Sequence, residues 1–371
     1  MSERLPDSRF YGIIPAGGVG SRLWPLSRAE RPKFLHDLTG EGRSLLRATW
    51  ERLAAVSGPD RIMVVTGAAH ADAVRAQLPE LTGADIVLEP SPRDSAAAIG
   101  LAAAILLRRD PDVIVGSFAA DHVIDDLDAF TATVRQAIYA ADAGYIATIG
   151  ITPTEAATGF GYSRVGPALD IPQAPDVHVV AAFVEKPDRA TAEAYFGSGH
   201  YLWNAGMFIA RADRLLAEIE RSRPALHAGI LELAAAWEEA DTRAEALERI
   251  WPGLEKVAID YAVAEPAAAD GDLVVVPGHF GWDDIGDFAA VAKLHEDAGG
   301  LAVLGDAELV VAEDATGIVV PRGKRIVALI GVHDIVVVDT EDALLVTTRD
   351  QAQRVKGIVD SLRAAGRDAV L

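Results

Sequence analysis

The stretch from Gly12 to Leu35 gathers residue types that suit the binding of a phosphate group. It begins as a short apolar run that stops at Gly17 and Gly18, where the backbone can turn sharply and bring its N–H groups against an anion because no Cβ intervenes. The loop that follows carries four cations: Arg22, Arg28, Arg31 and Lys33. In a chain whose formal net charge is -21, this concentration of positive charge predicts a phosphate site.

Two common phosphate-binding motifs do not fit this loop. A P-loop needs G-x-x-x-x-G-K-[ST], and neither glycine is followed by that ending at the required spacing. A dinucleotide fingerprint needs G-x-G-x-x-G before a helix, whereas Leu23 stands where the third glycine belongs. What remains is a glycine turn with Arg22 two residues after Gly20. Taken alone, this pattern is equally typical of an ordinary turn with surface cations.

Two acidic clusters follow apolar runs further along the chain. Asp121 lies in G-S-F-A-A-D-H-V and Asp284 lies in G-W-D-D-I-G-D. Mg²⁺ commonly uses one or two carboxylates together with substrate phosphates. The two clusters and the cationic loop therefore predict a magnesium–nucleotide site. The alternative for Asp121 is a turn residue that caps the helix predicted to begin near Asp126.

Between these clusters lie polar side chains that suit a sugar phosphate. Glu185 in F-V-E-K-P can accept hydrogen bonds from sugar hydroxyls and Lys186 can balance a phosphate, although such a pair is usually a solvated turn. Asn204 is one amide in the apolar run W-N-A-G-M-F. A buried amide needs partners for its donors and its acceptor, so Asn204 is either a member of a structural network or a ligand contact.

The elements that must position these residues alternate between strand and helix as far as Ile149. This alternation is the pattern of a parallel α/β sheet, in which ligands bind beyond the carboxyl ends of the strands. The predicted strands cover residues 11–16, 61–66, 85–88, 113–118, 145–149, 177–185, 203–210 and 273–277. The predicted helices up to Ile149 cover residues 44–56, 68–77, 95–107 and 127–141.

Two other regions differ from this alternating pattern in their composition and predicted elements. Residues 151–175 are rich in Gly, Pro and Thr, which predicts an inserted loop region. From about Gly300 onward, short β segments are predicted to end in a helix near residues 351–363, and these strands could stack as a short β-helix. We therefore predict a larger α/β domain of residues 1–298 and a small β-rich C-terminal domain of residues 299–371.

Composition excludes several classes of function. The chain has 34 Lys and Arg against 55 Asp and Glu, a balance that repels a nucleic-acid backbone or an anionic membrane surface. It has no cysteine, which excludes disulfides and thiolate metal sites. Residues 1–10 lack the apolar core of a signal peptide, and no run approaches the roughly 18 apolar residues of a membrane span. We expect a cytoplasmic protein with no nucleic-acid or membrane partner.

The order of the motifs resembles that of the mannose-1-phosphate guanylyltransferases, also called GDP-mannose pyrophosphorylases, in the sugar-nucleotidyltransferase superfamily. The match spans roughly residues 11 to 350 and rests on G-G-V-G-S-R-L-W-P-L-S-R, R-P-K-F-L, A-D-H-V-I, G-I-T-P-T-E-A-A-T-G-F-G-Y, F-V-E-K-P, W-N-A-G-M-F, I-D-Y-A-V-A-E and G-W-D-D-I-G. The resemblance implies a Rossmann-like, mostly parallel sheet flanked by helices in residues 1–298, the nucleotidyltransferase catalytic domain. It also implies transfer of GMP from GTP to mannose 1-phosphate, with GDP-mannose and pyrophosphate as products.

The resemblance further implies a role for individual residues. The nucleotide would contact Ala16, Gly17, Gly18, Gly20, Ser21, Arg22, Lys33, Glu89, Ser95 and Asp121. The sugar phosphate would contact Gly159, Glu185, Lys186, Asn204 and Asp260. The catalytic residues would be Arg22, Lys33, Asp121 and Lys186. The ligands of Mg²⁺, the implied cofactor, would be Asp121 and Asp284.

The resemblance implies in-line attack by a phosphate oxygen of mannose 1-phosphate on the α-phosphorus of GTP, and the family often forms homodimers. Two segments depart from the family pattern. The chain has P-K-F-L where P-K-Q-F-L is usual, and R-D-S-A-A-A-I where R-N-T-A-P-A-I is usual. The alternatives are a guanylyltransferase for another manno-configured sugar 1-phosphate, such as a heptose, and a non-catalytic regulatory protein that binds nucleotide sugars.

Overall fold

The computed structural model describes residues 5–295 and 300–371, and a nine-stranded sheet forms its centre. The strand order is β3-β2-β1-β4-β9-β6-β10-β8-β7. The strands are β1 (Phe10–Ala16), β2 (Ile62–Gly67), β3 (Ile86–Glu89), β4 (Ile114–Ser117), β6 (Ile146–Ile151), β7 (Tyr162–Ala168), β8 (His178–Val184), β9 (Tyr201–Arg211) and β10 (Leu273–Gly278). β9 and β8 run against the other strands, so the sheet is mixed although most strands share one direction.

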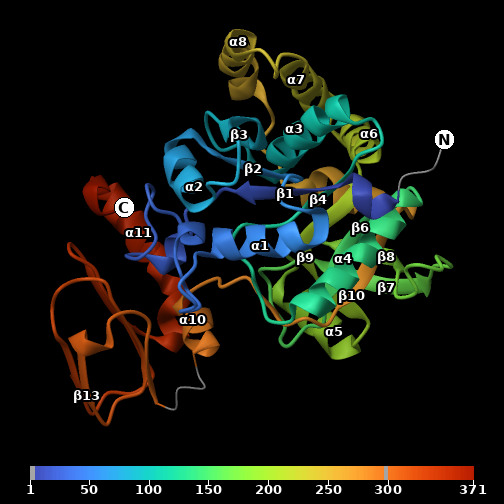
Figure 1. Ribbon diagram of the computed structural model, residues 1–371. Helices are drawn as coiled ribbons and strands as arrows, with labels where there is room; N and C mark the ends of the chain where they lie inside the picture. The colour runs from blue at the N-terminus through green and yellow to red at the C-terminus, as the bar shows by residue number, and fades with distance from the viewer. Residues whose placement is uncertain (1–4, 296–299) are drawn as a thin grey trace.

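Helices cover both faces of the sheet (Figure 1) and form two apolar cores with it. One core includes α1 (Leu45–Ser57), α2 (Ala71–Gln77) and α4 (Leu127–Asp142). The other includes α3 (Asp94–Arg109), α6 (Ala212–Ser222), α7 (Pro224–Ala235), α8 (Ala240–Ile250) and α9 (Glu265–Asp270). α3 is buried without interruption from residue 96 to 106, and its alanines and Gly100 allow α6 and α7 to pack closely on it.

The strand and helix alternation predicted from the sequence is confirmed as far as β6, with boundaries that differ by a few residues. The prediction of a loop for residues 151–175 is wrong for Tyr162–Ala168. That segment forms β7, which pairs with both β8 and β9. Its Gly166 and Pro167 hide the strand pattern, and two register irregularities in its pairing with β8 accommodate the segment.

Shorter elements complete the part of the chain before residue 295. α5 (Arg189–Ser198) follows β8, and α10 (Phe288–Leu294) ends this region. The two-residue strands β5 (Val123–Ile124) and β11 (Trp282–Asp283) pair with each other. That pairing brings the Asp121 and Asp284 regions side by side. Among the described residues, no helix has the length and apolar character needed to cross a membrane.

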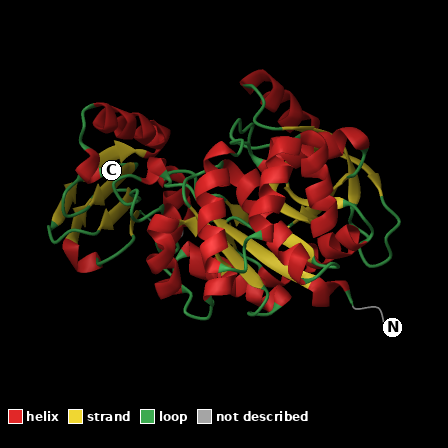
Figure 2. Cartoon of the chain, turned by 90° about the horizontal axis from the view of Figure 1, so that it is seen from above, coloured by secondary structure: helices red, strands yellow, loops and turns green. Residues whose placement is uncertain are grey.

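The C-terminal residues form the predicted short β-helix. Parallel strands stack in two rows, β12-β14-β16 and β13-β15, and β17 closes the first row in antiparallel fashion. The elements are β12 (Leu301–Val303), β13 (Val310–Glu313), β14 (Gly317–Pro321), β15 (Val327–Ile330), β16 (Ile335–Asp339), β17 (Leu344–Thr348) and the final helix α11 (Val355–Ala364). Figure 2 shows this part as a smaller lobe beside the main body.

The loop after β1 lies against this smaller lobe. Leu23, Trp24 and Leu26 share one apolar core with Ile318 and Val336 of the β-helix. The Trp24 indole N–H also donates a hydrogen bond to the carbonyl of Val370, with an N···O distance of 2.6 Å. The β-helix therefore helps to hold the loop in which the sequence predicts the phosphate site.

Candidate active site

The glycine loop that follows β1 is shaped by its contact with Lys33. Gly18 and Gly20 have positive φ angles of 81° and 72°, which side chains rarely adopt. A Cβ at Gly20 would lie only 2.7 Å from Cβ of Lys33, whereas one at Gly18 would meet no atom within 4 Å. The Lys33 backbone N–H donates to the carbonyl of Val19 at 3.2 Å. Glycine is therefore required at position 20 for the loop to close over Lys33.

Lys33 joins three segments that are far apart in sequence. Its side chain is buried, and Nζ lies 2.8 Å from Oδ2 of Asp121 and donates to the backbone carbonyl of Asp284. Burial alone would raise the pKa of Asp121, but the charge of Lys33 holds this pKa below its usual value. The Asp121 carboxylate is therefore ionised at neutral pH. Arg22 lies on the exposed turn directly after Gly20.

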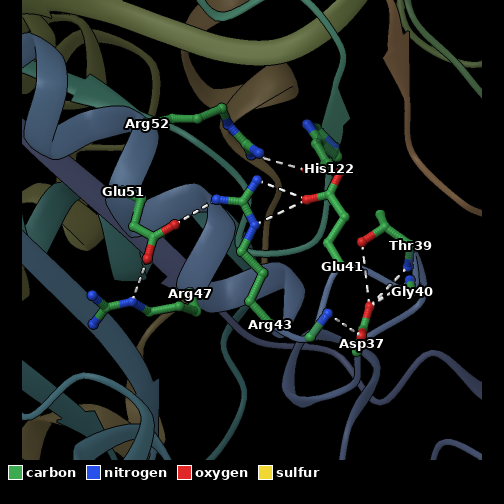
Figure 3. Close-up of polar contacts among 10 residues, drawn as sticks. Asp37, Thr39, Gly40, Glu41, Arg43, Arg47, Glu51, Arg52 and His122 are labelled. Carbon is green, nitrogen blue, oxygen red and sulfur yellow. Dashed lines mark hydrogen bonds and ion pairs between the residues drawn. The ribbon is translucent and has the colours of Figure 1, made fainter.

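The capping alternative for Asp121 is wrong. The carboxylate that caps α4 belongs to Asp126, which accepts the backbone N–H groups of Asp128 and Ala129 at 3.1 and 2.9 Å. The turn after Asp121 is held from behind, because the guanidinium of Arg52 donates to the carbonyl of His122 at 2.9 Å (Figure 3). Asp121 is thus a fixed carboxylate that faces Lys33.

Asp284 differs from the acidic residues around it. Asp283 accepts the backbone N–H of Ile285 at 2.7 Å, and Asp287 accepts those of two residues that begin α10. Among the described residues, the carboxylate of Asp284 has no hydrogen-bond partner. Burial raises the pKa of Asp284 to about 6, the charge of Lys33 opposes this, and the charges of Asp283 and Asp121 add to it. Two neighbouring carboxylates with one cation form a locally electronegative site.

A pocket of about 370 Å³ lies beyond the carboxyl ends of β1, β3 and β4. This is a volume at the lower end of the range for small-molecule sites. Residues predicted from the sequence to bind ligand line it: Gly17, Gly18, Glu89, Ser95, Asp121 and Asp260. Sequence reasoning missed other lining residues: Ser117, Gly206, Phe208 and Ile259. Two of them carry a signal in the sequence. Ser117 is the last position of a strand, and Gly206 is a glycine inside the W-N-A-G-M-F strand.

Glu89 is a buried carboxyl group that lacks a partner. It ends β3, it is 8% exposed, and its Oε1 atom has no hydrogen-bond partner among the described residues. Burial raises the pKa of Glu89 to about 7, and the charge of Asp94 adds to this shift. Such a group suits the N–H donors of a ligand. Ser95 lies nearby, and its hydroxyl accepts the backbone N–H of Ile259 at 2.8 Å.

Asn204 belongs to a buried hydrogen-bond network. Its Nδ2 donates to Oδ1 of Asp260 at 2.7 Å. Its Oδ1 accepts the hydroxyl of Thr148 at 2.8 Å and the backbone N–H of Gly206 at 3.1 Å. Asn204 is thus a member of a structural network that holds Asp260 at the pocket wall, and its contact with a sugar stays a prediction. Burial raises the pKa of Asp260 to about 7, and the charge of Glu185 adds to this shift.

Of the pair Glu185 and Lys186, only Lys186 is solvated. The side chain of Glu185 is 6% exposed, and its Oε1 atom lies 2.9 Å from Nζ of Lys186. Its Oε2 atom is buried with no hydrogen-bond partner among the described residues, and a Cβ at Gly161 would lie 2.5 Å from it. Lys186 has a positive φ of 47°. Gly159 lies in the exposed loop before β7, where a Cβ would meet no atom within 4 Å.

The structure thus brings six of the predicted residues to the lining of one pocket, and it divides the four cations of the loop. Lys33 faces Asp121, whereas Arg28 is turned to the C-terminal lobe and forms an ion pair with Asp342 at 2.7 Å. Arg31 lines a separate cleft together with Arg28. Arg28 and Arg31 therefore lie apart from Lys33, and Arg22 and Lys33 remain the loop cations predicted to bind phosphate.

Comparisons with known proteins agree with this geometry. Residues 11–299 match the nucleotidyl transferase family, and residues 305–362 match the mannose-phosphate isomerase/GMP-like beta-helix domain. A mannose-1-phosphate guanylyltransferase of Escherichia coli (strain K12) is 38% identical over 368 residues, which are 98% of this chain and 75% of that protein. The xanthan biosynthesis protein XanB of Xanthomonas campestris pv. campestris (strain B100) is 39% identical over 373 residues, with 99% and 75% coverage.

A solved structure extends the likeness to three dimensions. A Thermus thermophilus protein, described as a mannose-1-phosphate geranyltransferase, superposes with a TM-score of 0.83 at 32% identity, covering 96% of this chain and 99% of that one. The likeness includes both the nine-stranded sheet and the β-helix, since nearly the whole of each chain is matched. The chain therefore belongs to the nucleotidyl transferase family and, within it, to the mannose-1-phosphate guanylyltransferases.

Proposed function

We propose that this protein transfers GMP from GTP to α-D-mannose 1-phosphate, which forms GDP-mannose and pyrophosphate. The observation that carries the proposal is one pocket whose wall includes the glycine loop, Asp121 and Asp260. An anion-binding loop and a buried set of hydrogen-bond acceptors therefore meet in one place, as a nucleotide and a sugar phosphate require. The relatives named above as mannose-1-phosphate guanylyltransferases support the identity of the two substrates.

The triphosphate would be held by the glycine-loop backbone, Arg22 and Lys33. A lysine ammonium group has three N–H donors. Two of those of Lys33 are used by Asp121 and the carbonyl of Asp284, which leaves one for a phosphate oxygen. Ala16, at the end of β1, and Ser21 would contribute contacts from the two ends of the loop.

The base and the sugar would lie on opposite sides of this loop. Glu89 would accept N–H groups of guanine, because its Oε1 atom is buried without a partner among the described residues. Ser95 would support this side through Ile259. Glu185 and Asp260 would accept sugar hydroxyls, while the exposed end of Lys186 would bind the sugar phosphate. Gly159 would border the sugar from the loop before β7.

The reaction needs positioning and charge neutralisation rather than an activated side chain. A phosphate oxygen of mannose 1-phosphate forms a bond to the α-phosphorus of GTP. The bond from that phosphorus to the β-phosphate oxygen breaks, and pyrophosphate departs with the electron pair. Arg22 and Lys33 would neutralise the charge on the departing group, and Lys186 would orient the attacking phosphate.

The donor set fits a divalent metal ion. Asp121 is ionised beside Lys33, and the Asp284 carboxylate has no partner among the described residues. Within those residues no group of three or more metal-ligating side chains occurs, so a bound Mg²⁺ would complete its shell with phosphates and water. When bound there, Mg²⁺ would withdraw charge from the phosphate oxygens. The oxygen-only donor set favours Mg²⁺ over softer metals.

The test is pyrophosphate release from GTP with mannose 1-phosphate, glucose 1-phosphate and a manno-configured heptose 1-phosphate, each with and without Mg²⁺. We expect release with mannose 1-phosphate and Mg²⁺, with GDP-mannose identified by mass. Faster release with the heptose would assign a different sugar. No release with any sugar would favour a non-catalytic nucleotide-sugar-binding protein.

The proposed partners are small molecules: GTP, mannose 1-phosphate, GDP-mannose and pyrophosphate. The cytoplasmic location and the homodimer implied by the family resemblance stay predictions. Sedimentation equilibrium of the purified chain would test the homodimer, since a single species of the monomer mass of 39.2 kDa would contradict it.

A further inference from the structure

A second cleft lies on the opposite side of the loop that carries Lys33. It has a volume of about 940 Å³ and lies between residues 25–47 and the β-helix residues 322 and 340–342. Its lining includes Arg28 and Arg31, two of the four cations of that loop. Its cationic lining consists of Arg28, Arg31, Arg43, Arg47 and Arg322, with His36 beside them.

Three of these arginines are neutralised by nearby carboxylates. Arg28 pairs with Asp342 at 2.7 Å. Arg43 and Arg47 converge on Glu51 from the two sides shown in Figure 3. Arg43 also pairs with Glu41 and Arg47 with Glu80, both at 2.7 Å. These side chains build the wall of the cleft without leaving excess positive charge.

The remaining two arginines have no such partner. For Arg31 and Arg322, no ion pair is found within the described part of the chain. Partial loss of water and the nearby charge of Arg31 both lower the pKa of Arg322, so the two guanidiniums act on each other. Burial lowers the pKa of His36 to about 4, and both arginines act in the same direction. His36 is therefore neutral and lines the cleft as an uncharged ring.

The charge of Asp37 acts on Arg322 and opposes the lowering of its pKa, but within the described residues no carboxylate forms an ion pair with Arg31 or Arg322. Asp37 accepts the backbone N–H groups of Gly40 and Gly42 at 2.7 and 2.8 Å and so serves its own turn (Figure 3). Asp342 is occupied by Arg28. Glu341 is exposed and forms no ion pair that the described residues show. In a chain with net charge -21, two neighbouring arginines that form no ion pair within the described residues mark a place for an external anion.

We propose that this cleft binds a phosphorylated small molecule through Arg31 and Arg322, and that its occupancy regulates the catalytic pocket. The planar guanidinium forks of two arginines match the oxygens of a phosphate group. The cleft volume exceeds the need of a lone phosphate and suits a sugar phosphate or a nucleotide. The two arginines come from the phosphate-loop segment and the β-helix, so one anion would bridge both lobes.

The coupling would pass through the backbone between Arg31 and His36. Lys33 lies in this segment, and its carbonyl accepts the backbone N–H of His36 at 3.1 Å. The ring of His36 lies 3.1 Å from the carbonyl of Arg31. An anion that draws Arg31 toward Arg322 therefore acts on the short turn that positions Lys33 beside Asp121, which lines the catalytic pocket. This regulatory step rests on the proposed function, whereas anion binding does not.

Binding is tested by calorimetry on the full chain with inorganic phosphate and with fructose 1,6-bisphosphate, at constant ionic strength. We expect saturable binding of at least one probe, weakened at least ~10-fold in the double variant Arg31→Gln/Arg322→Gln, the scale for losing charged hydrogen bonds. The binding should be retained in Lys33→Ala and in Arg363→Gln, an exposed arginine of α11 outside the cleft. No binding to wild type, unchanged binding in the double variant, or loss in Lys33→Ala would overturn the proposal.

Regulation is tested by pyrophosphate release with and without the probe that binds. We expect the probe to change the KM for GTP or kcat of the wild type and to leave the double variant unaffected. The double variant should match the wild type when no probe is present, because Arg31 and Arg322 lie outside the catalytic pocket. Binding without any change in rate would overturn the regulatory role. A wild type without transferase activity would refute the proposed function and leave the calorimetry to decide the site.

Discussion

The nucleotide half and the sugar half of the catalytic pocket are built by different means. The nucleotide half uses the ends of the parallel strands β1, β3 and β4, a glycine loop, and the ion pair between Lys33 and Asp121. The sugar half uses antiparallel strands and the buried network of Asn204, Asp260 and Glu185. The first half presents cations to an anion, whereas the second keeps acceptors away from water.

This difference indicates in which half a substitution of ligand-binding residues also changes the stability of the fold. Arg22, the exposed cation of the nucleotide half, costs the fold little, since water solvates it until a ligand binds, whereas Lys33 is buried against Asp121. Buried acceptors cost more, because they lose water and repel each other, as the raised pKa of Asp260, about 7, reflects. We therefore expect substitution of Arg22 to change the rate more than the stability, and substitutions in the sugar network to change both.

The largest effect is expected for Lys33→Ala. The loss of this charge-stabilising donor should lower kcat/KM by at least ~10²-fold, measured as initial rates of pyrophosphate release. Arg22→Ala should have an effect of the same order. Arg75→Ala, which removes an exposed arginine of α2, is the matched control and should behave as wild type. Wild-type turnover in both Lys33→Ala and Arg22→Ala would refute the phosphate-loop assignment.

Glu89→Gln tests a buried carboxyl group that lies in the nucleotide half, although that half otherwise presents cations to the ligand. Its folded pKa of about 7 lies above the value of 4.5 that applies when it is exposed. The folded state therefore holds its proton more tightly, and wild-type stability falls as the pH rises from about 4.5 to about 7. The variant has no carboxyl group to titrate at this position and does not lose stability in this way. Its unfolding free energy should equal that of the wild type near pH 4 and exceed it by up to about 3 kcal/mol above pH 7.

The measurement for Glu89→Gln is urea unfolding of the ligand-free protein at pH 5 and pH 8. A gain of equal size at both values would show that the carboxyl group does not titrate in this range. A smaller effect of the same sign would indicate partial access of water to the pocket.

Asn204→Ala tests the sugar half. The substitution leaves the hydroxyl of Thr148 and the carboxyl of Asp260 without their amide partner, which should cost about 2 kcal/mol of unfolding free energy. The KM for mannose 1-phosphate should rise more than that for GTP. Gln136→Ala is the control, because this exposed amide pairs only with Asp176 at the surface, at 2.9 Å, and should change stability by less than about 0.5 kcal/mol. Loss of activity with unchanged stability would break the proposed distinction between the halves.

The pair Gly18→Ala and Gly20→Ala separates backbone strain from contact with Lys33. Both positions have positive φ, so each substitution should cost about 1 kcal/mol. Only Gly20 faces a close atom, Cβ of Lys33, so Gly20→Ala should cost about 1 kcal/mol more in urea unfolding. Equal costs would mean that the loop does not rest on Lys33.

The sequence predicts the nucleotide half well because its signals are local. The strands before β6 are short apolar runs, and Ser44, a typical capping residue, caps α1 by accepting the N–H of Arg47 at 3.1 Å. The direction of Asp121 toward Lys33 could be inferred only by combining motifs. The roles assigned to Ser95 and Gly159 stay predictions.

The remainder depended on three-dimensional context. Strand β7 escaped prediction because its partners supply the pairing that its own residues do not signal. The separation of Arg28 from Lys33 depends on which side of a loop each side chain leaves, and this is set by the β-helix far along the chain. The missing partner of Glu89 is a property of its surroundings, which no spacing in the sequence reveals.

The position of β9 has a consequence for biosynthesis. β4 pairs with β1 on one side and with β9 on the other, yet about ninety residues separate the end of β4 from that partner. While the chain emerges from the ribosome, β4 remains an open edge that can pair with another chain. The loop that carries Lys33 reaches its final packing later still, because its apolar partners Ile318 and Val336 are synthesised near the C-terminal end of the chain. The first segment of the catalytic pocket to be synthesised is thus among the last to reach its final packing.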